Sequence, residues 1–571
     1  MSLTATRNRA PSQSVGRPWV PKLSGAAAYL IGLLDIWSGL RRGMPAPFRQ
    51  ITDLVPGAIN DAAAAATVVT GILLLVVGHG LRRRKTRAWR AAVVLLAVTI
   101  ALQIWHGHWL ALLVAALVLA AFVWQRGEFY ALGDPATRWQ SLRAFVVLFV
   151  ASTVIGWLML WLDRRAIVGG WPGTWEVLRH VWLGLVGISG PVALRSDRLD
   201  DLIGAVLLGL GLMTVLVTVY LLLRPPEPAP ELTVDDEARL RELLTTSPDS
   251  LGYFNLRRDK SVVWSDTQKA AVAYRVVGGV MLASGDPIGD PDAWPGAMTT
   301  FLDTARAHAW TPAVLGCSER AGHGWLRAGE FSAMELGDEA VLEVDDFSLT
   351  GRPMRNVRQM VSRIRRAGYE TQVCRVRDLP RDLADTVLRD ADAWRSTETE
   401  RGFSMALGRT ADPVDPDAVL VTASEGGRVR GLLQFVPWGR DGMSLDLMRR
   451  DSEAHAGVNE LLIAAAMDAA PSLGVTRVSL NFAVFRSVFE RGERLGAGPL
   501  LRGWRRILVF LSRWFQIESL YRFNAKFQPD WQPRFLIYPG PADLPRVGVA
   551  ALEAEAFIVW PRWRRLTGHP S

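Results

Sequence analysis

Long apolar runs constrain this chain more than any other feature, and nearly all of them lie before Arg224. An apolar helix of ~20 residues crosses the ~30 Å hydrocarbon core of a bilayer. A stretch at Ala91–Trp124 would overshoot as one span and is interrupted by His106-Gly107-His108, so we expect two short helices there. Residues 24–223 are therefore predicted to be a transmembrane domain of about six helices, of which four read as clear spans: Ser24–Leu40, Ala62–Leu81, Ala144–Leu162 and Leu202–Leu223.

The distribution of basic residues orients these helices. Leu81–Arg90 reads LRRRKTRAWR, and short loops rich in lysine and arginine stay on the cytoplasmic side. With an even number of spans, the tail 1–23 lies on that side too, and residues 163–201 form an outer loop. We expect a multi-pass protein of the plasma (cell) membrane with a cytoplasmic C-terminal region. No cleaved signal peptide is expected, because Ser24–Leu40 is followed by further spans.

After the last span the chain changes character. Residues 225–230 read PPEPAP, a stiff non-helical stretch, and residues 224–245 are interpreted as a linker. Beyond it, short apolar strands such as Ala270–Leu282 alternate with amphipathic helices such as Trp294–His308, which predicts an α/β fold. The alternation restarts near Leu379, so we predict two α/β units, at 246–384 and 385–571.

Several classes of chemistry lose support because their motifs are missing. The sequence contains no G-x-x-x-x-G-K-[ST], no H-E-x-x-H and no G-x-S-x-G. His106 and His108 have no carboxylate or third histidine nearby, so no metal site is expected there. Cys317 and Cys374 are too few for a disulfide framework and are expected to be free thiols in a reducing compartment. We predict no metal and no cofactor. Asp35, inside the first span, is functional, hydrogen-bonded to a neighbouring helix, or positioned near the outer interface.

The net charge of +9 comes mainly from arginine. Arginine grips phosphate with two parallel hydrogen bonds and stays charged, which suits anionic lipid headgroups, RNA or both. The competing explanation is a genome rich in G and C that prefers arginine codons.

A family resemblance is carried by five blocks, which read SGDPIGD from Ser284, ELGDEAVLEVDDFSLTGR from Glu335, WRSTETERGFSMALG from Trp394, SLDLMRR from Ser444 and ESLYRFNAKFQPDWQPRFLIY from Glu518. In this order they resemble the lysylphosphatidylglycerol synthase (multiple peptide resistance factor) family and cover most of residues 250–560. The likeness is greatest to the actinobacterial form, in which this module is joined to a lysyl-tRNA synthetase. The sequence ends at Ser571 without a synthetase segment, which leaves the identity of the amino acid open.

The resemblance implies a fold, a donor and an acceptor. The expected architecture is a polytopic α-helical membrane domain followed by tandem acetyltransferase-like (GNAT) α/β domains. Ordinary acetyltransferases carry a [QR]-x-x-G-x-[GA] loop for the pyrophosphate of acetyl-CoA, and the junction Arg449–Gly457 reads RRDSEAHAG without it. Acetyl-CoA is therefore not the expected donor. The family implies aminoacyl-tRNA as donor and a lipid hydroxyl as acceptor.

The resemblance also implies site residues. Asp446 and Arg449 match the functional pair, with Asp446 as general base and Arg449 holding a phosphate or the developing oxyanion. Their spacing straddles the end of the expected strand Gly442–Met448, so both are expected to face the cleft at its rim; the alternative is a structural ion pair. Lys526 completes the catalytic set, with a solvated lysine as the alternative. Residues expected at the substrates are Trp394, Arg395, Phe403, Ser404 and Glu518 for the acceptor, and Arg352, Arg355, Arg358 and Arg363, on the basic helix Arg352–Arg366, for tRNA. A membrane-facing or merely solvated basic face is the alternative for that helix.

Together these features predict an aminoacyl-tRNA-dependent phosphatidylglycerol aminoacyltransferase, with lysine as the favoured amino acid. Its partners would be lysyl-tRNA, phosphatidylglycerol and the membrane, and self-association is left open. The product would lower the anionic charge of the membrane and so give resistance to cationic antimicrobial peptides. Alternatives are transfer of alanine or another amino acid, diacylglycerol as acceptor, a lipid flippase with a non-catalytic soluble domain, and a peptidyl aminoacyltransferase.

Overall fold

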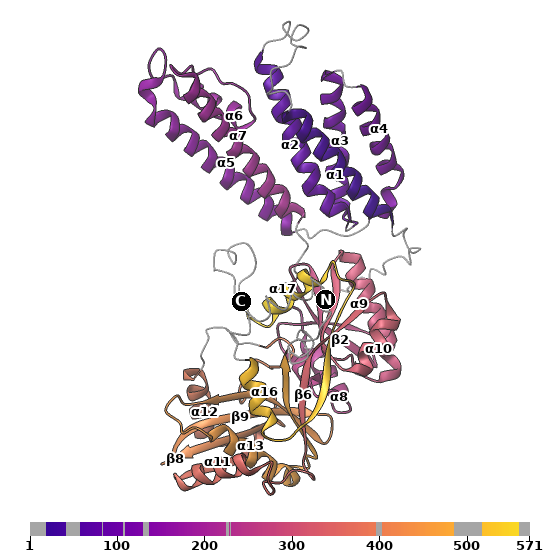
Figure 1. The fold of residues 1–571 in the computed structure, drawn as a ribbon, viewed down its shortest axis with the longest axis vertical. Helices are drawn as coiled ribbons and strands as arrows, with labels where there is room; N and C mark the ends of the chain where they lie inside the picture. The colour runs from indigo at the N-terminus through magenta and orange to yellow at the C-terminus, as the bar shows by residue number, and fades with distance from the viewer. Residues whose placement is uncertain are drawn as a thin grey trace, which may run out of the picture. The chain divides into compact units, whose positions relative to one another are not determined.

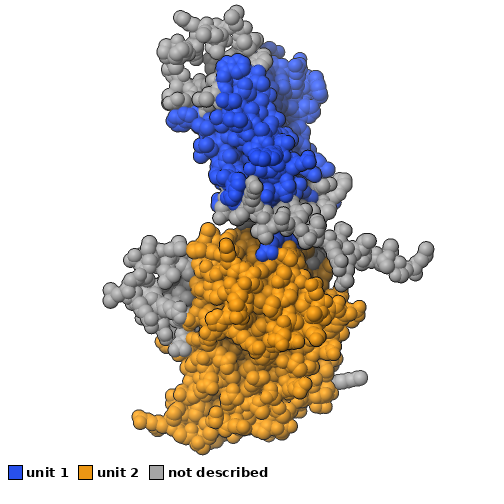
Figure 2. Space-filling model, turned by 90° about the vertical axis from the view of Figure 1, so that its right-hand side faces the viewer, with its two compact units in different colours: residues 1–226, 306–309 blue, residues 227–305, 310–571 orange. Residues whose placement is uncertain are grey.

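The computed structural model describes residues 19–40, 57–82, 84–106, 109–129, 136–223, 228, 230–394, 402–484 and 517–558. The chain divides into two compact units, residues 1–226 with 306–309 and residues 227–305 with 310–571, which Figure 2 shows in separate colours. The first is an N-terminal helical region, and the second is built around a mixed β-sheet.

The helical region contains seven α-helices among its described residues (Figure 1): α1 (Trp19–Leu40), α2 (Gly57–Arg82), α3 (Thr86–His106), α4 (Trp109–Trp124), α5 (Ala136–Leu162), α6 (Thr174–Leu185) and α7 (Asp197–Leu223). Helices α1 to α4 share one apolar core, and α5 to α7 share another. The predicted break in Ala91–Trp124 is confirmed, since α3 ends at His106 and α4 begins at Trp109.

Two of the described helices are long and apolar enough to cross a membrane. They are Ser141–Leu162 within α5 and Arg198–Leu222 within α7, with mean hydropathies of 2.3 and 2.5. Only 17% of each apolar window is buried, so most of its side chains face outward, as lipid contact requires. These helices indicate membrane association. The other predicted spans coincide with α1 to α4, and a total of about six stays a prediction.

Glycines bring α1 and α2 into close contact. A Cβ atom on Gly32 would lie 2.6 Å from the carbonyl oxygen of Gly71, and one on Gly71 would lie 2.5 Å from that of Gly32. Asp35 is buried in the same region and accepts hydrogen bonds from Thr99 and Gln103 of α3. The helix–helix hydrogen bond that the sequence left as one alternative for Asp35 is therefore present.

The second unit contains a twelve-stranded sheet in the order β1-β2-β3-β5-β12-β6-β11-β10-β9-β8-β7, with β4 paired to β2. Its strands are β1 (Ser261–Trp264), β2 (Ala270–Val277), β3 (Val280–Ser284), β4 (Ile288–Gly289), β5 (Thr311–Cys317), β6 (Ser332–Glu343), β7 (Tyr369–Arg375), β8 (Val419–Glu425), β9 (Arg428–Trp438), β10 (Gly442–Arg450), β11 (Arg477–Val484) and β12 (Asp530–Tyr538). The pairs β3–β5 and β10–β11 are parallel, and the other pairs are antiparallel.

The prediction of a single strand at Ala270–Leu282 is wrong. The segment forms the hairpin β2–β3, which turns at Gly278 and Gly279 with φ of +56° and +74°. Two consecutive residues with positive φ form the tight turn that matches the twist of paired strands, and glycine adopts it without a steric cost. Apolar residues stand directly before and after these two glycines, so the apolar pattern did not reveal the turn.

Helices cover both faces of the sheet: α8 (Val234–Leu244), α9 (Trp294–His308), α10 (Glu319–Ala328), α11 (Arg355–Arg366), α12 (Arg381–Ala393), α13 (Val458–Ala469), α16 (Ile517–Ala525) and α17 (Leu544–Ala554). Over β6 to β11, the face that packs on α11 and α13 also holds Phe523 and Phe527 at the end of α16, while α12 covers the opposite face. Over β2, β3 and β5, α9 and α10 cover one face, and α8 and α17 the other.

The last strand joins distant parts of the chain. β12 lies between β5 and β6, although almost two hundred residues separate β6 from β12 in the sequence (Figure 1). The apolar cluster around β2 and β3 accordingly takes in Val547 and Ala550 of α17. One continuous sheet runs through both predicted α/β units, and the boundary predicted between residues 384 and 385 stays a prediction.

Candidate functional site

A β-bulge decides how Asp446 and Arg449 are displayed. In a regular strand, side chains three residues apart point to opposite faces. In β10, however, Leu445 pairs with Phe435 and Leu447 pairs with the next residue, Gln434, so Asp446 is an extra residue. A bulge resets the alternation of side chains. Asp446 and Arg449 consequently lie on the same face of the sheet, the face covered by α12.

Among the described residues, donors reach both oxygens of the Asp446 carboxylate. The backbone N–H of Leu407 donates to Oδ1 over 2.6 Å, and Nε2 of Gln434 donates to Oδ2 over 2.6 Å. Leu407 lies in the segment that follows the acceptor-site candidates Phe403 and Ser404. The two donors fix the orientation of the carboxylate relative to the strand, which a general base requires.

Arg449 and Trp394 lie on the α12 face, as Asp446 does. Nη1 of Arg449 donates to the carbonyl oxygen of Ala391 in the last turn of α12. Trp394 follows that helix and packs in the same apolar cluster as Ala391 and Leu447. The structure therefore brings together three of the residues that the sequence singled out, Asp446, Arg449 and Trp394.

Phe403 and Ser404 are fully buried rather than exposed at a surface. Their backbone N–H groups donate to the carboxylate of Glu555, and so does the Ser404 hydroxyl. Their role at the acceptor stays a prediction. Arg395 lies outside the described residues. Glu518 lies in α16, and its side chain is outside the described part of the structure.

Lys526 is not brought to Asp446. It follows α16, and its Nζ lies 2.7 Å from Oε1 of Glu460 on α13. Helix α13 covers the face opposite to the one that Asp446 and Arg449 occupy. Lys526 is therefore ion-paired on the other side of the sheet, and a catalytic role for it stays a prediction.

A hollow of about 150 Å³ lies on the Lys526 side, lined by residues of β6, the segment after it and residues 527–530. Glu343, Asp346 and Asp530 contribute its charged side chains. Carboxylates repel phosphate, so this hollow does not suit the headgroup of an anionic lipid.

The four arginines proposed for tRNA differ in their surroundings. Arg355 and Arg363 are exposed on α11, and Arg352 is exposed just before it. Arg358 is half-buried and donates to the carbonyl oxygens of Leu349 and Gly351, so it holds the preceding loop. The apolar face of the helix, with Val357, Val361 and Ile364, is buried in the core.

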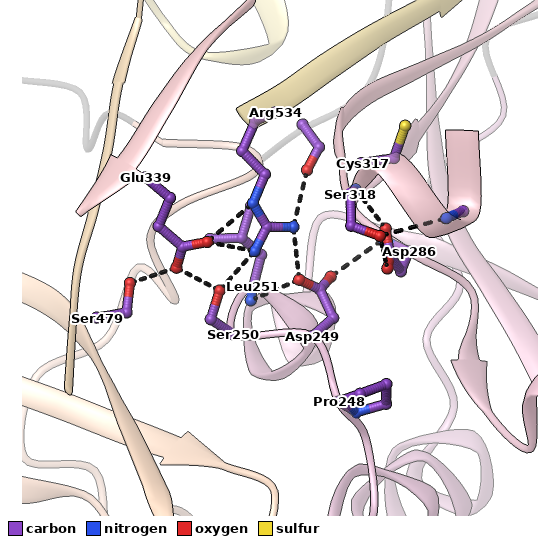
Figure 3. A network of polar contacts seen from close by, with 12 residues as sticks. Pro248, Asp249, Ser250, Leu251, Asp286, Cys317, Ser318, Glu339, Ser479 and Arg534 are labelled. Carbon is purple, nitrogen blue, oxygen red and sulfur yellow. Dashed lines mark hydrogen bonds and ion pairs between the residues drawn. The ribbon is translucent and has the colours of Figure 1, made fainter. Parts of the chain in front are cut away.

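A buried ionic network lies where β12 meets β6, and no role had been assigned to it from the sequence (Figure 3). Arg534 of β12 donates to Asp249 over 2.7 Å, to Ser250 over 2.7 Å and to Glu339 of β6 over 2.9 and 2.5 Å. Glu339 also accepts hydrogen bonds from the hydroxyls of Ser250 and Ser479. The sequence signal for this network is Arg534, a charged residue beside the apolar residues of β12, because a buried charge needs partners.

Asp286 extends this network toward α10. Its carboxylate accepts from the backbone N–H and hydroxyl of Ser318, and its own N–H donates to Asp249 (Figure 3). Burial raises the pKa of Asp286 above its ordinary value, and the negative charge of Asp249 raises it further. Asp286 belongs to the SGDPIGD block, and its partners are Ser318, which caps α10, and Asp249, in the loop after α8.

Lys260 is a second fully buried charge site. Its Nζ donates to the Phe254 carbonyl oxygen, Asn255 Oδ1 and Ser284 Oγ, and it lies 4.6 Å from the ring centroid of Phe403. Burial lowers the pKa of Lys260 to about 7. Lys260 thus packs against Phe403, in the segment whose Leu407 donates a hydrogen bond to Asp446.

The described part of the chain also contains histidines, carboxylates and two cysteine thiols. Its residues contain no group of three or more histidine, cysteine, aspartate or glutamate side chains that could hold a metal ion. Burial raises the pKa of both cysteine thiols, Cys317 and Cys374, which disfavours the reactive thiolate. The arrangement at β10 offers a carboxylate and a guanidinium on one face, which suits proton transfer next to an anion.

A protein family and several known proteins match this chain. Residues 241–538 match the family model described as "Phosphatidylglycerol lysyltransferase, C-terminal". The chain is similar to the "Lysylphosphatidylglycerol biosynthesis bifunctional protein LysX" of Rhodococcus opacus (strain B4), with 44% identity over 80% of this chain and 41% of that protein. It is 40% identical to the protein of the same name from Mycobacterium avium (strain 104), over 96% of this chain and 48% of that protein.

The chain thus spans about half the length, or less, of these curated relatives. Among solved structures it is similar to that titled "The structure of L-PGS from Bacillus licheniformis", with a TM-score of 0.50 and 21% identity. The match covers 58% of this chain and 99% of that one. At that identity the likeness establishes the fold of the α/β region.

Proposed function

Because the chain belongs to the phosphatidylglycerol lysyltransferase family, we propose that it transfers a lysyl group from lysyl-tRNA to a hydroxyl of phosphatidylglycerol. Such a product would carry a cationic headgroup in place of an anionic one, and a membrane containing it would bind cationic antimicrobial peptides less strongly.

The reaction exchanges one ester for another. The lipid hydroxyl oxygen bonds to the aminoacyl carbonyl carbon, the bond from that carbon to the tRNA ribose oxygen breaks, and the proton passes to the ribose oxygen. The donor ester is already activated, so the reaction requires positioning, proton transfer and stabilisation of the oxyanion.

The observation that carries the proposal is the shared face of Asp446 and Arg449. The bulge in β10 places both on the α12 side, and two hydrogen bonds orient the Asp446 carboxylate. Asp446 would accept the hydroxyl proton, and Arg449 would hold the lipid phosphate or the developing oxyanion. Trp394, Arg395, Phe403, Ser404 and Glu518 remain candidates for the acceptor side, and Lys526 for neutralising a phosphate.

For the donor, we propose that the exposed arginines Arg352, Arg355 and Arg363 contact the tRNA backbone. Their guanidinium groups would displace counterions from phosphates, so binding should weaken as salt rises. Arg358 is less suited, because it is engaged with the loop before α11.

For the membrane, we propose about six spans with both the N-terminal tail and the α/β region on the cytoplasmic side, where aminoacyl-tRNA occurs. A reporter fused after Ser571 should be active only in the cytoplasm. Activity of that reporter only outside the cytoplasm would contradict the topology and the donor together.

The function is tested with the purified full chain in phosphatidylglycerol vesicles. Lysyl-tRNA without ATP or added metal should yield lysyl-phosphatidylglycerol by lipid mass spectrometry, and RNase treatment of the donor should abolish it. Parallel reactions with alanyl-tRNA, or with vesicles containing diacylglycerol instead, identify the amino acid and acceptor. Product formed from acetyl-CoA, or formed after RNase treatment, would overturn the proposal.

A further inference from the structure

Residues 402–411, which we call the strap, contain no helix or strand, yet they are hydrogen-bonded to side chains from distant parts of the sequence. The strap begins after α12 and passes Phe403, Ser404 and Leu407 before it reaches β8. Its contacts connect Glu555, which directly follows α17, with Asp446 in β10.

At its first end the strap is held by one buried carboxylate. Oε2 of Glu555 accepts from the Phe403 N–H over 2.6 Å, and Oε1 accepts from the Ser404 N–H over 2.9 Å and the Ser404 hydroxyl over 2.5 Å. Glu555 is 5% exposed, so these three donors replace the water that burial removed. The site therefore requires an acceptor on both oxygens of residue 555.

At its other end the strap meets the Asp446 carboxylate. The Leu407 N–H donates to Oδ1 of Asp446. Gln434 fastens the same region, since its Nε2 donates to Oδ2 of Asp446 and to the Arg409 carbonyl oxygen, and its Oε1 accepts from the Ala411 N–H. The direction of the Asp446 carboxylate thus depends on where the strap lies.

The strap has little slack between these two ends. Only two residues separate Ser404 from Leu407, and a chain extends at most ~3.6 Å per residue. Asn481 donates to the Met405 carbonyl oxygen over 2.8 Å, and Arg257 donates to the carbonyl oxygens of Gly402 and Ala406. A shift at Ser404 would therefore reach Leu407.

We infer that Glu555 is a positioning residue for Asp446, acting through residues 402–411. The inference rests on the proposed function, because it assigns Asp446 the proton-accepting role. It means that a residue just after α17, the helix that packs on β2 and β3, sets the geometry of a carboxylate in β10, on the other side of β12 in the sheet. A displacement of about 1 Å at a reacting group costs up to ~10²-fold in rate.

The test compares two buried glutamates that each accept serine hydroxyls. Glu555→Gln keeps the size of the side chain but replaces one acceptor oxygen by an NH₂ group, so one strap N–H loses its acceptor. Glu339→Gln makes the same change at Ser250 and Ser479, neither of which is hydrogen-bonded directly to the described residues of the strap. Ser479 reaches the strap through Asn481. The full chain in phosphatidylglycerol vesicles is assayed with lysyl-tRNA, per folded molecule.

For Glu555→Gln we expect kcat to fall ~10-fold or more with KM for both substrates within about twofold of wild type. Ser404→Ala, a milder change that removes one donor, should lower kcat less, and Glu339→Gln should leave it unchanged. In an Asp446→Asn background, Glu555→Gln should cause no further loss, because the group that it positions is already gone.

Two results would overturn the inference: wild-type kcat in both Glu555→Gln and Ser404→Ala, or an equal further loss in the Asp446→Asn background. A wild-type chain that forms no aminoacyl-lipid would instead contradict the proposed function itself, before any variant is compared.

Discussion

The helical region and the α/β region place their polar groups in opposite ways. In α5 and α7, large apolar side chains such as Val147 and Leu202 are 65% and 58% exposed, and in α1 the polar Asp35 is 3% exposed. In the α/β region most large apolar side chains are buried, and buried charges such as Arg534, Lys260 and Glu555 have hydrogen-bond partners. The difference follows from the solvent expected around each region.

The two regions also use different forces to bring elements together. Where lipid surrounds helices, burying apolar surface between them brings little gain, so close contact at small residues matters more. The Gly32–Gly71 crossing has that form. In the sheet, burial of apolar residues dominates, and charges are tolerated only with partners on several strands. Each region should therefore be destabilised by a different kind of substitution.

The largest effect is expected at the centre of the sheet. Arg534→Ala leaves Asp249 and Glu339 buried without their cation, which should lower the free energy of unfolding of the α/β region by about 3–5 kcal/mol. Chemical unfolding of the full chain in detergent, with hydrogen exchange resolved by region, measures it. Exposed Arg440 provides the control Arg440→Ala, and a loss below about 1 kcal/mol in Arg534→Ala would show that the network is not needed.

Next comes the chemistry on the α12 face. Asp446→Asn keeps the shape of the side chain but removes the base, so turnover per folded molecule should fall ~10²-fold or more. Arg449→Lys keeps the charge but loses the planar fork and should also lower turnover. Asp441→Asn, in the turn that precedes β10, is the control. If Asp446 belongs to a structural pair, activity would instead decline only in proportion to the folded fraction.

A smaller effect separates the helical region from the sheet. Gly32→Ala places a methyl group 2.6 Å from a carbonyl oxygen, so α1 and α2 must move apart, at about 1–3 kcal/mol. Gly209→Ala in α7 meets no atom within 4 Å and should be neutral or slightly stabilising. Thermal unfolding of the full chain in detergent compares them. Equal midpoints would mean that the glycine contact contributes nothing.

The smallest effect is a pH dependence in the network. The pKa of Asp286 lies above its ordinary 3.8, so over that interval the folded protein binds more protons than the unfolded protein. The free energy of unfolding contributed by Asp286 should therefore fall as pH rises from about 4 toward the raised value and then level off. Asp286→Asn should remove this slope, while Asp290→Asn, on an exposed residue of the same block, should keep it. Parallel pH profiles in wild type and Asp286→Asn would contradict the assignment.

The amino-acid sequence by itself determined the features that depend on neighbours along the chain. Run length and the break at residues 106–108 located the helices α3, α4, α5 and α7. The helix expected at Trp294–His308 has the limits of α9, and the basic helix expected at Arg352–Arg366 contains α11. These features are local because a helix satisfies its own backbone hydrogen bonds.

Only the tertiary structure decided the features that depend on pairing between distant segments. The position of β12 between β5 and β6 and the bulge that turns Asp446 to the face of Arg449 follow from strand register. Lys526 lies on the opposite face because it pairs with Glu460 of α13. The contact of Glu555 with Ser404 likewise joins residues about 150 positions apart in the sequence. A strand leaves its hydrogen bonds to be completed by a partner, and the local sequence of neither strand specifies which partner that is.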